Sequence, residues 1–264
     1  MNRIAEKFNQ LKQEGRKALI TFLTAGDPTI ACTIKIVKEM ERKGADLIEL
    51  GIPYSDPIAE GPVIQAANER ALKNGIKIKD IMQAVKEMRN EVKVPLVYLL
   101  YFNCILQYGK DRFFSDCKDS GIDGLIIPDL PFEEQDELTE VAEKYQIDLI
   151  SLVSPVSEDR IEKIASNAKG FLYCVSSLGV TGTREGFETN FEEFFKSIDK
   201  YAAIPKAIGF GISTPEHIKK LKGYSDGLIV GSAIVRLIGN SKSEDEAVKN
   251  VGEFVSTLKS AFKK

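Results

Sequence analysis

Short apolar runs alternate along the chain with longer stretches in which apolar residues recur every three or four positions. The short runs have the length of β-strands and end at glycine, proline or polar residues. This pattern predicts eight strands, at residues 18–25, 47–50, 95–100, 124–127, 148–153, 171–175, 206–209 and 227–231. The longer stretches predict helices at residues 2–13, 29–42, 78–91, 111–120, 133–145, 157–167, 191–201 and 215–222, and others that begin at Pro62, after Gly231 and near Glu244.

Eight strands that alternate with helices within 264 residues predict an α/β fold, a single (β/α)8 TIM barrel. We expect residues 1–264 to form one domain, with an extra N-terminal helix and additional helices near the second and eighth strands. A doubly wound open sheet is the alternative. No GxGxxG motif follows the first strand, whereas glycine-bearing turns follow strands seven and eight, and both observations favour the barrel.

The composition, 43% hydrophobic and 28% charged, is that of an ordinary globular protein. A net charge of −3 and scattered lysines argue against a nucleic-acid or anionic-membrane surface. The four cysteines form no CxxC pair, no secretory leader precedes them, and no apolar run reaches membrane-spanning length, so we expect a cytoplasmic protein with reduced thiols. The single histidine, His217, is expected to be a solvated helix residue, and we expect no metal site.

A carboxylate within an apolar strand is the first candidate for chemistry. Glu49 lies among Leu and Ile residues, where an isolated charge is costly, so its pKa should be raised towards neutrality. A second acid, Glu60, follows eleven positions later, directly before a Gly-Pro pair that starts a predicted helix. Active sites of barrels gather at the carboxyl ends of the strands, which is where Glu49, Asp129 and Tyr173 fall.

The positions of lysines and glycines limit the types of reaction that the site could catalyse. Three lysines precede or begin predicted strands, at the opposite end of the barrel, and disfavour a Schiff-base mechanism: Lys17, Lys93 and Lys206. The glycine turns at residues 209–214 and 231–235 lead into helices, an arrangement that suits a phosphate group, although the same glycines also suit simple tight turns. The reaction type that remains is acid–base catalysis by carboxyl groups on a phosphorylated substrate.

Two further features concern the walls and the cover of a site. The segment at residues 176–190 contains three glycines and few apolar anchors, which is typical of a lid. Apolar side chains near the strand ends would either line a pocket for a flat aromatic group or only fill the core: Phe22, Leu99, Tyr101, Ile126 and Phe210.

Six sequence segments resemble one known family. IELGIPYSDPIAEGP, at residues 48–62, is similar to the signature of the tryptophan synthase alpha subunit. Further segments match that family in the same order and cover essentially the whole chain: LTAGDP at 23–28, PDLPFEE at 128–134, SSLGVTGTR at 176–184, GFGIS at 209–213 and GSAIV at 231–235. The resemblance implies reversible retro-aldol cleavage of indole-3-glycerol phosphate to indole and glyceraldehyde 3-phosphate, within tryptophan biosynthesis.

The resemblance also implies roles for individual residues. Glu49 is expected to be the acid and base, Glu60 the carboxylate that holds the indole N–H, and Tyr173 a side chain near the reacting centre. The implied phosphate site contains Gly182, Phe210, Gly211, Gly231 and Ser232. The indole wall is expected to contain Phe22, Leu99, Tyr101 and Ile126. The lid and communication with a partner are assigned to Pro53, Asp56 and Thr181.

The same resemblance implies a separate beta subunit that carries pyridoxal phosphate, an α2β2 assembly, and no cofactor in this chain. Two positions depart from the family pattern. Glu60 stands where aspartate is usual, and Cys104 stands where proline is common, the latter altering only a local turn. The longer carboxylate leaves open a weakly catalytic subunit that mainly activates its partner. A separate alternative is another phosphosugar-binding barrel enzyme such as an isomerase.

Overall fold

Parallel strands form the centre of the molecule. The computed structural model describes residues 2–155, 160–175, 188–209 and 211–263. In these ranges, nine strands form one sheet of parallel neighbours, in the order β5-β4-β3-β2-β1-β9-β8-β7-β6. The strands are β1 Ala18–Thr24, β2 Leu47–Gly51, β3 Leu96–Leu99, β4 Gly124–Ile126, β5 Asp148–Ile150, β6 Leu152–Val153, β7 Leu172–Val175, β8 Lys206–Gly209 and β9 Gly227–Val230.

The two outermost strands of this order are consecutive in the chain. β5 pairs with β4, β6 pairs with β7, and only Ser151 separates β5 from β6. The sheet therefore curves into a nearly closed barrel, as predicted. The single strand expected at residues 148–153 is split in two at Ser151, whose carbonyl oxygen still accepts a hydrogen bond from the Tyr173 N–H at 3.0 Å.

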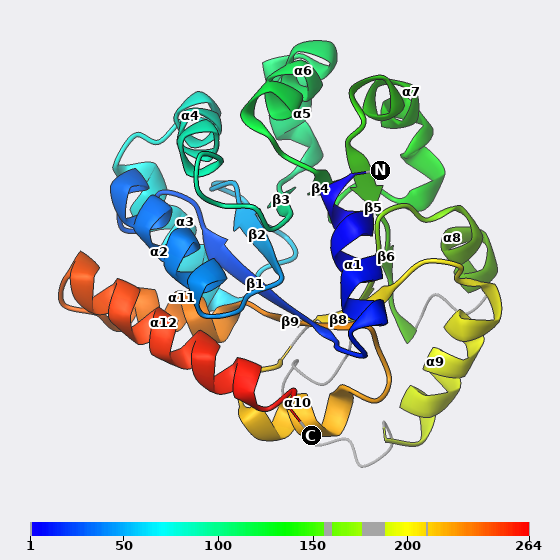
Figure 1. Cartoon of the computed structure of the whole chain (residues 1–264). Helices are drawn as coiled ribbons and strands as arrows, with labels where there is room; N and C mark the ends of the chain where they lie inside the picture. The colour runs from blue at the N-terminus through cyan, green and yellow to red at the C-terminus, as the bar shows by residue number, and fades with distance from the viewer. Residues whose placement is uncertain (1, 156–159, 176–187, 210, 264) are drawn as a thin grey trace.

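Helices surround the strands (Figure 1). They are α1 Arg3–Gln13, α2 Ile30–Arg42, α3 Pro62–Lys73, α4 Ile78–Met88, α5 Phe102–Tyr108, α6 Lys110–Ser120, the 3-10 helix η1 Phe132–Glu134, α7 Asp136–Tyr145, α8 Ile161–Asn167, α9 Glu188–Tyr201, α10 Pro215–Leu221, α11 Ser232–Asn240 and α12 Glu244–Ser260. Cys104 lies in α5, a helix that the sequence pattern did not predict. The helix starts at Phe102, whose N–H donates to the Asp129 carboxylate at 2.9 Å.

Apolar side chains fill the barrel interior beneath the site. The interior cluster combines residues of the strands with three residues of α1: Ala18, Ile20, Leu47, Val97, Ile126, Ile150, Phe171, Tyr173, Ala207 and Ile229, with Ile4, Phe8 and Leu11. At the N-terminus of α1, the Asn2 amide donates to Asp148 Oδ2 at 2.5 Å and Arg3 pairs with Asp123 at 2.8 Å. Both aspartates lie where β4 and β5 begin, so α1 closes the end of the barrel opposite the carboxyl ends of the strands.

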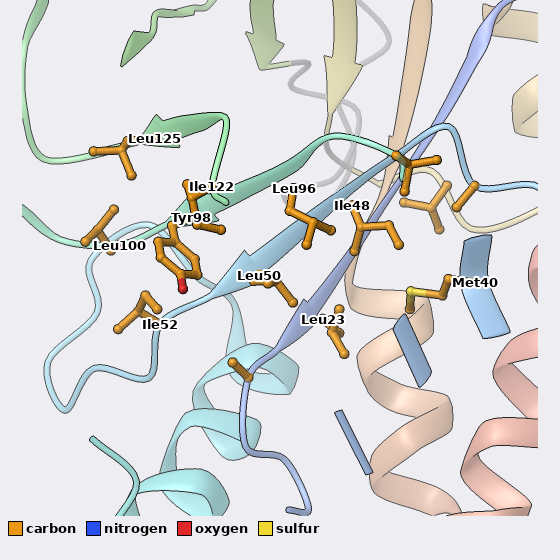
Figure 2. Packing of buried hydrophobic residues seen from close by; sticks show 14 of the residues in the cluster. Leu23, Met40, Ile48, Leu50, Ile52, Leu96, Tyr98, Leu100, Ile122 and Leu125 are labelled. Atoms are coloured by element: carbon orange, nitrogen blue, oxygen red, sulfur yellow. The ribbon is translucent and has the colours of Figure 1, made fainter. Parts of the chain in front are cut away.

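A second apolar layer lies between the strands and the helices. Because neighbouring residues of a strand face opposite sides, Ile48 and Leu50 face the helices while Leu47 and Glu49 face the interior. Figure 2 shows part of this outer layer, with Leu23, Met40, Ile48, Leu50, Ile52, Leu96, Tyr98, Leu100, Ile122 and Leu125. In the described ranges, no helix combines the length and the apolarity needed to cross a membrane.

Candidate active site

Glu49 is held inside the barrel by the register of three strands. It lies level with Phe22 of β1 and Val97 of β3, and its side chain is 1% exposed. Its Oε1 atom has no hydrogen-bond partner in the described part of the chain. Burial raises the pKa of the Glu49 carboxyl to about 8, because the charged form would lose its hydration without compensation.

Glu60 is held by a tyrosine from the next strand-to-helix segment. The Tyr101 hydroxyl donates to Glu60 Oε2 and accepts the N–H groups of Ile58 and Ala59, each at 2.9 Å. The Tyr101 ring also stacks on Tyr54, with ring centroids 4.8 Å apart and an interplanar angle of 23°. One side chain therefore fixes both the backbone and the carboxylate at the end of the β2–α3 loop.

The local environment shifts the pKa of Glu60 upward. Burial is the largest cause, and the hydrogen bond from Tyr101 opposes it by stabilising the charged carboxylate. Burial and the neighbouring Glu60 raise the pKa of the Tyr101 hydroxyl, which accordingly keeps its proton and remains a donor. The pair thus presents one ordered carboxylate, which suits an acceptor for a ring N–H.

Tyr173 of β7 brings a hydroxyl into the same interior. It is 9% exposed, and burial together with the charge of Glu49 raises its pKa well above the usual value. The ring packs directly against Gly209 of β8, where an added Cβ would lie 2.4 Å from the Tyr173 hydroxyl. Gly209 therefore makes the space that Tyr173 occupies, and the tyrosine hydroxyl keeps its proton near enough to Glu49 for the charge of that carboxyl to affect its pKa.

These side chains meet at a cavity of about 310 Å³ at the carboxyl end of the barrel. Its lining comes from β1, β2, β3, β7 and β9 and from the segments that follow the strands. The lining residues are Phe22, Glu49, Ala59, Glu60, Gly61, Pro62, Val63, Ile64, Leu99, Pro128, Tyr173, Gly211, Ile212, Ile229, Gly231, Ser232 and Arg236. An apolar wall with two carboxyl groups fits a flat aromatic ligand that carries a polar N–H.

Another part of the cavity lining contains glycine turns and the N-terminus of helix α11. Gly211 has φ +74°, a backbone conformation that favours glycine. Gly231 is the N-cap of α11, and its carbonyl oxygen accepts the N–H groups of Ile234 and Val235 at 2.8 and 3.1 Å. The first N–H groups of an α-helix have no acceptor within the helix, so the start at Ser232 offers donors to an anion.

Several predicted site residues lie outside the cavity lining or outside the described residues. Ile126 is fully buried in the barrel interior, and Tyr101 holds the β2–α3 loop. Pro53 is buried at the start of that loop, whereas Asp56 is exposed and accepts a hydrogen bond from Ser55. The predicted positions Thr181, Gly182 and Phe210 lie outside the described residues.

Sequence reasoning did not find Arg236, which lines the cavity from α11. A usable signal was present, because Arg236 follows Ser232 by four positions and residues at this spacing share one helix face. The walls formed by Pro128, Ile212 and Ile229 were also not singled out. Their positions depend on how the segments after β4 and β8 converge with β9, which local periodicity does not encode.

Two of the lysines lie at the amino ends of strands, as the sequence predicted. Lys17 pairs with Asp226 at 3.1 Å and Lys206 pairs with Asp199, both where strands begin. Within the described ranges the cavity lining includes no lysine, and no group of three or more His, Cys, Asp or Glu side chains is arranged to hold a metal ion. His217 is exposed on α10, as predicted.

Comparisons with known proteins agree with this geometry. A family model described as tryptophan synthase alpha chain matches residues 8–263. The tryptophan synthase alpha chain of a Thermoanaerobacter species is 58% identical over 259 residues, which cover 98% of this chain and 99% of that protein. A crystal structure of the tryptophan synthase alpha chain from Legionella pneumophila is similar with a TM-score of 0.89 at 34% identity, covering 99% of this chain and 97% of that one.

A crystal structure of a tryptophan synthase complex from Pyrococcus furiosus is similar with a TM-score of 0.83 at 35% identity, covering 92% of this chain and 98% of that one. The family match therefore extends over both halves of the barrel, including the strands and loops that line the cavity. The chain belongs to the tryptophan synthase alpha chain family, carbon–carbon lyases that cleave indole-3-glycerol phosphate in tryptophan biosynthesis.

Proposed function

We propose that Glu49 is the acid and base of this cleavage and that the indole-3-glycerol phosphate lies in the cavity above it. One observation carries the proposal: a carboxyl group that is 1% exposed, with an oxygen unpartnered in the described residues, lines the cavity. With a pKa raised to about 8 by burial, the group holds a proton at neutral pH. A pKa near the working pH suits a group that first gives and then takes a proton.

In the first step, the protonated Glu49 carboxyl transfers its proton to C3 of the indole ring. The ring becomes an indolenine-like cation whose positive charge is shared with the ring nitrogen. The Glu49 carboxylate then accepts the proton of the hydroxyl on the carbon attached to C3. The bond between C3 and that carbon breaks, and its electron pair returns to the ring. The products are indole and glyceraldehyde 3-phosphate, and Glu49 is again protonated.

Glu60 accepts a hydrogen bond from the ring N–H and stabilises the cation as its charge develops. Its side chain is one methylene longer than the aspartate usual in the family, and a longer side chain has more rotamers to restrict. Tyr101 supplies this restriction, because its hydroxyl is fixed by two backbone N–H groups and donates to the carboxylate. We infer that Glu60 replaces aspartate as a functional partner of the ring nitrogen.

The remaining lining orients the substrate. Tyr173 donates to the oxygen on the reacting carbon, since its hydroxyl is protonated and lies near Glu49. Phe22 and Leu99 contact the indole ring. The turn at Gly211 and the start of α11 at Gly231 and Ser232 bind the phosphate, with Gly182 and Phe210 as additional contacts proposed from sequence.

Alpha chains of this family have no cofactor of their own, and pyridoxal phosphate is bound by the beta subunit. We propose an α2β2 assembly in the cytoplasm, in which the barrel is a single domain. We propose that Pro53 and Asp56 of the β2–α3 loop report the state of Glu60 to the beta subunit, and the 79% exposure of Ile58 in the same loop supports this role. Thr181 is proposed to close over the same loop.

The proposal is tested with indole-3-glycerol phosphate and the assembled enzyme. The wild-type protein should release indole and glyceraldehyde 3-phosphate in equal amounts. Chromatographic separation of indole from indole-3-glycerol phosphate follows the reaction. Glu49→Gln should slow release about 10²- to 10⁴-fold while its circular dichroism spectrum stays unchanged. Cleavage by Glu49→Gln at the wild-type rate would refute the assignment of Glu49.

A further inference from the structure

Arg236 carries the positive charge of the cavity. It is the one cationic side chain in the described lining, which otherwise contains apolar residues, glycines, a serine, a tyrosine and two carboxyl groups. It lies on α11 one turn after Ser232, and helical side chains lean towards the helix N-terminus. This tilt directs the Arg236 side chain towards the end of α11 at which Gly231 and Ser232 present their N–H groups.

Arg236 also differs from the other arginines in its surroundings. Seven described arginines have a carboxylate oxygen within 4.0 Å: Arg3 with Asp123, Arg16 with Glu14, Arg42 with Glu39, Arg70 with Asp27, Arg89 with Asp123, Arg112 with Asp116 and Arg160 with Glu133. Arg236 has no such partner among the described residues, although Glu49 and Glu60 line the same cavity. Its charge is left for a ligand.

We infer that Arg236 is a specificity residue that selects the phosphorylated substrate by pairing with its phosphate group. A guanidinium offers N–H donors in a planar fork that matches two phosphate oxygens. The helix N-terminus and the glycine turn supply only partial charges, so the fork provides the full positive charge that a phosphate dianion favours. The inference extends the proposed function, since it adds a side chain to the phosphate end of the site.

The location of Arg236 separates its role from the chemistry. It lies on the helix after β9, whereas Glu49 is on β2 and Glu60 on the loop after it, and β1 lies between β2 and β9. Loss of Arg236 should therefore weaken binding of the phosphate without changing proton transfer at the indole ring. Loss of a charge-assisted hydrogen bond at an exposed site should raise the dissociation constant about ten-fold.

The test compares Arg236→Gln and Arg236→Lys with the wild type. A matched control is Arg112→Gln, which removes an exposed arginine of α6 that pairs with Asp116 at 3.8 Å and does not line the cavity. Arg236→Gln should raise the KM for indole-3-glycerol phosphate about ten-fold while kcat changes less than about two-fold. Arg236→Lys should recover part of the loss, and Arg112→Gln should match the wild type.

Two further measurements distinguish phosphate recognition from a structural effect. Calorimetric binding of inorganic phosphate should weaken about ten-fold in Arg236→Gln, and this readout holds even if the protein cleaves no substrate. In the reverse reaction, the KM for glyceraldehyde 3-phosphate should rise while that for indole stays constant. Unchanged binding of inorganic phosphate, or an equal rise in the KM for indole, would overturn the inference without affecting the assignment of Glu49.

Discussion

The two ends of the barrel hold buried carboxyl groups in different ways. At the amino end, Asp123 is 4% exposed and accepts hydrogen bonds from Arg3 at 2.8 Å, Arg89 at 2.6 Å and the Leu96 N–H at 2.9 Å. At the carboxyl end, Glu49 is 1% exposed and has an oxygen without a partner in the described residues.

This difference separates a structural carboxylate from a reactive carboxyl. Asp123 joins α1, the end of α4 and the start of β3, so its charge is compensated by the groups that it holds together. Among the described residues, no opposite charge compensates Glu49 in the barrel interior, and it avoids the cost of burial by retaining a proton. The proton that burial imposes on Glu49 is the one that the cleavage requires.

The largest expected effect is on activity at the carboxyl end. Glu49→Gln keeps the shape of the side chain but cannot exchange a proton, so kcat for indole release should fall about 10²- to 10⁴-fold. The free energy of unfolding should not decrease at pH 7, because no ion pair is lost. A variant that unfolds more easily than the wild type would show that Glu49 has a structural role similar to that of Asp123.

The matching change at the amino end should have the opposite outcome. Asp123→Asn removes the charge between Arg3 and Arg89, and breaking a buried ion pair typically costs roughly 3 kcal/mol. Urea denaturation should show this loss, whereas kcat per folded molecule should remain close to that of the wild type. A fall in kcat as large as that of Glu49→Gln would contradict the division between the two ends.

A third prediction concerns the space around Tyr173. In Gly209→Ala the new Cβ would lie 2.4 Å from the tyrosine hydroxyl, so the ring must leave its present position. Overpacking of this kind costs roughly 1–3 kcal/mol, and a misplaced donor near the reacting centre should lower kcat by about 100-fold. Gly223→Ala is the control, since its Cβ would meet nothing within 4 Å. Equal effects of the two substitutions on kcat would argue against a role for Tyr173.

The smallest expected effect on kcat comes from substitution of Tyr101, whose hydroxyl holds the Glu60 carboxylate. Tyr101→Phe removes the hydroxyl that orients this carboxylate, and kcat should fall about ten-fold because one charge-assisted hydrogen bond is lost. Tyr54→Phe keeps the stacked ring and removes a hydroxyl whose one hydrogen bond among the described residues is a 3.4 Å contact from Asn103, so it serves as the control. A Tyr101→Phe enzyme with wild-type kcat would mean that Glu60 needs no support.

Strand alternation was sufficient to predict the position of Glu49, because the period of two residues fixes which side chains face the barrel interior. The same reasoning predicted the barrel, since regular alternation of strands and helices is a local pattern. It did not predict the split at Ser151 or helix α5, which depend on pairing with β7 and on the carboxylate of Asp129.

The support of Glu60 could not be predicted from the sequence for a related reason. Tyr101 and Glu60 are 41 positions apart, and their hydrogen bond depends on how two loops converge. Tyr101 carries an aromatic ring that fits an indole wall equally well, so residue type alone did not indicate its contact. Arg236 is intermediate, because its spacing from Ser232 was visible whereas the absence of a nearby carboxylate required the structure.

The pH dependence of stability tests most directly whether Glu49 is buried in its neutral form. Burial raises its pKa from 4.5 to about 8 in the folded protein. Between these pH values the unfolded chain releases the proton and the folded protein keeps it, so stability is lost as pH rises. Relative to Glu49→Gln, the wild-type free energy of unfolding should fall by about 3 kcal/mol from pH 5 to 7 and level off above pH 8. A difference between the two proteins that stays constant over this range would contradict the account.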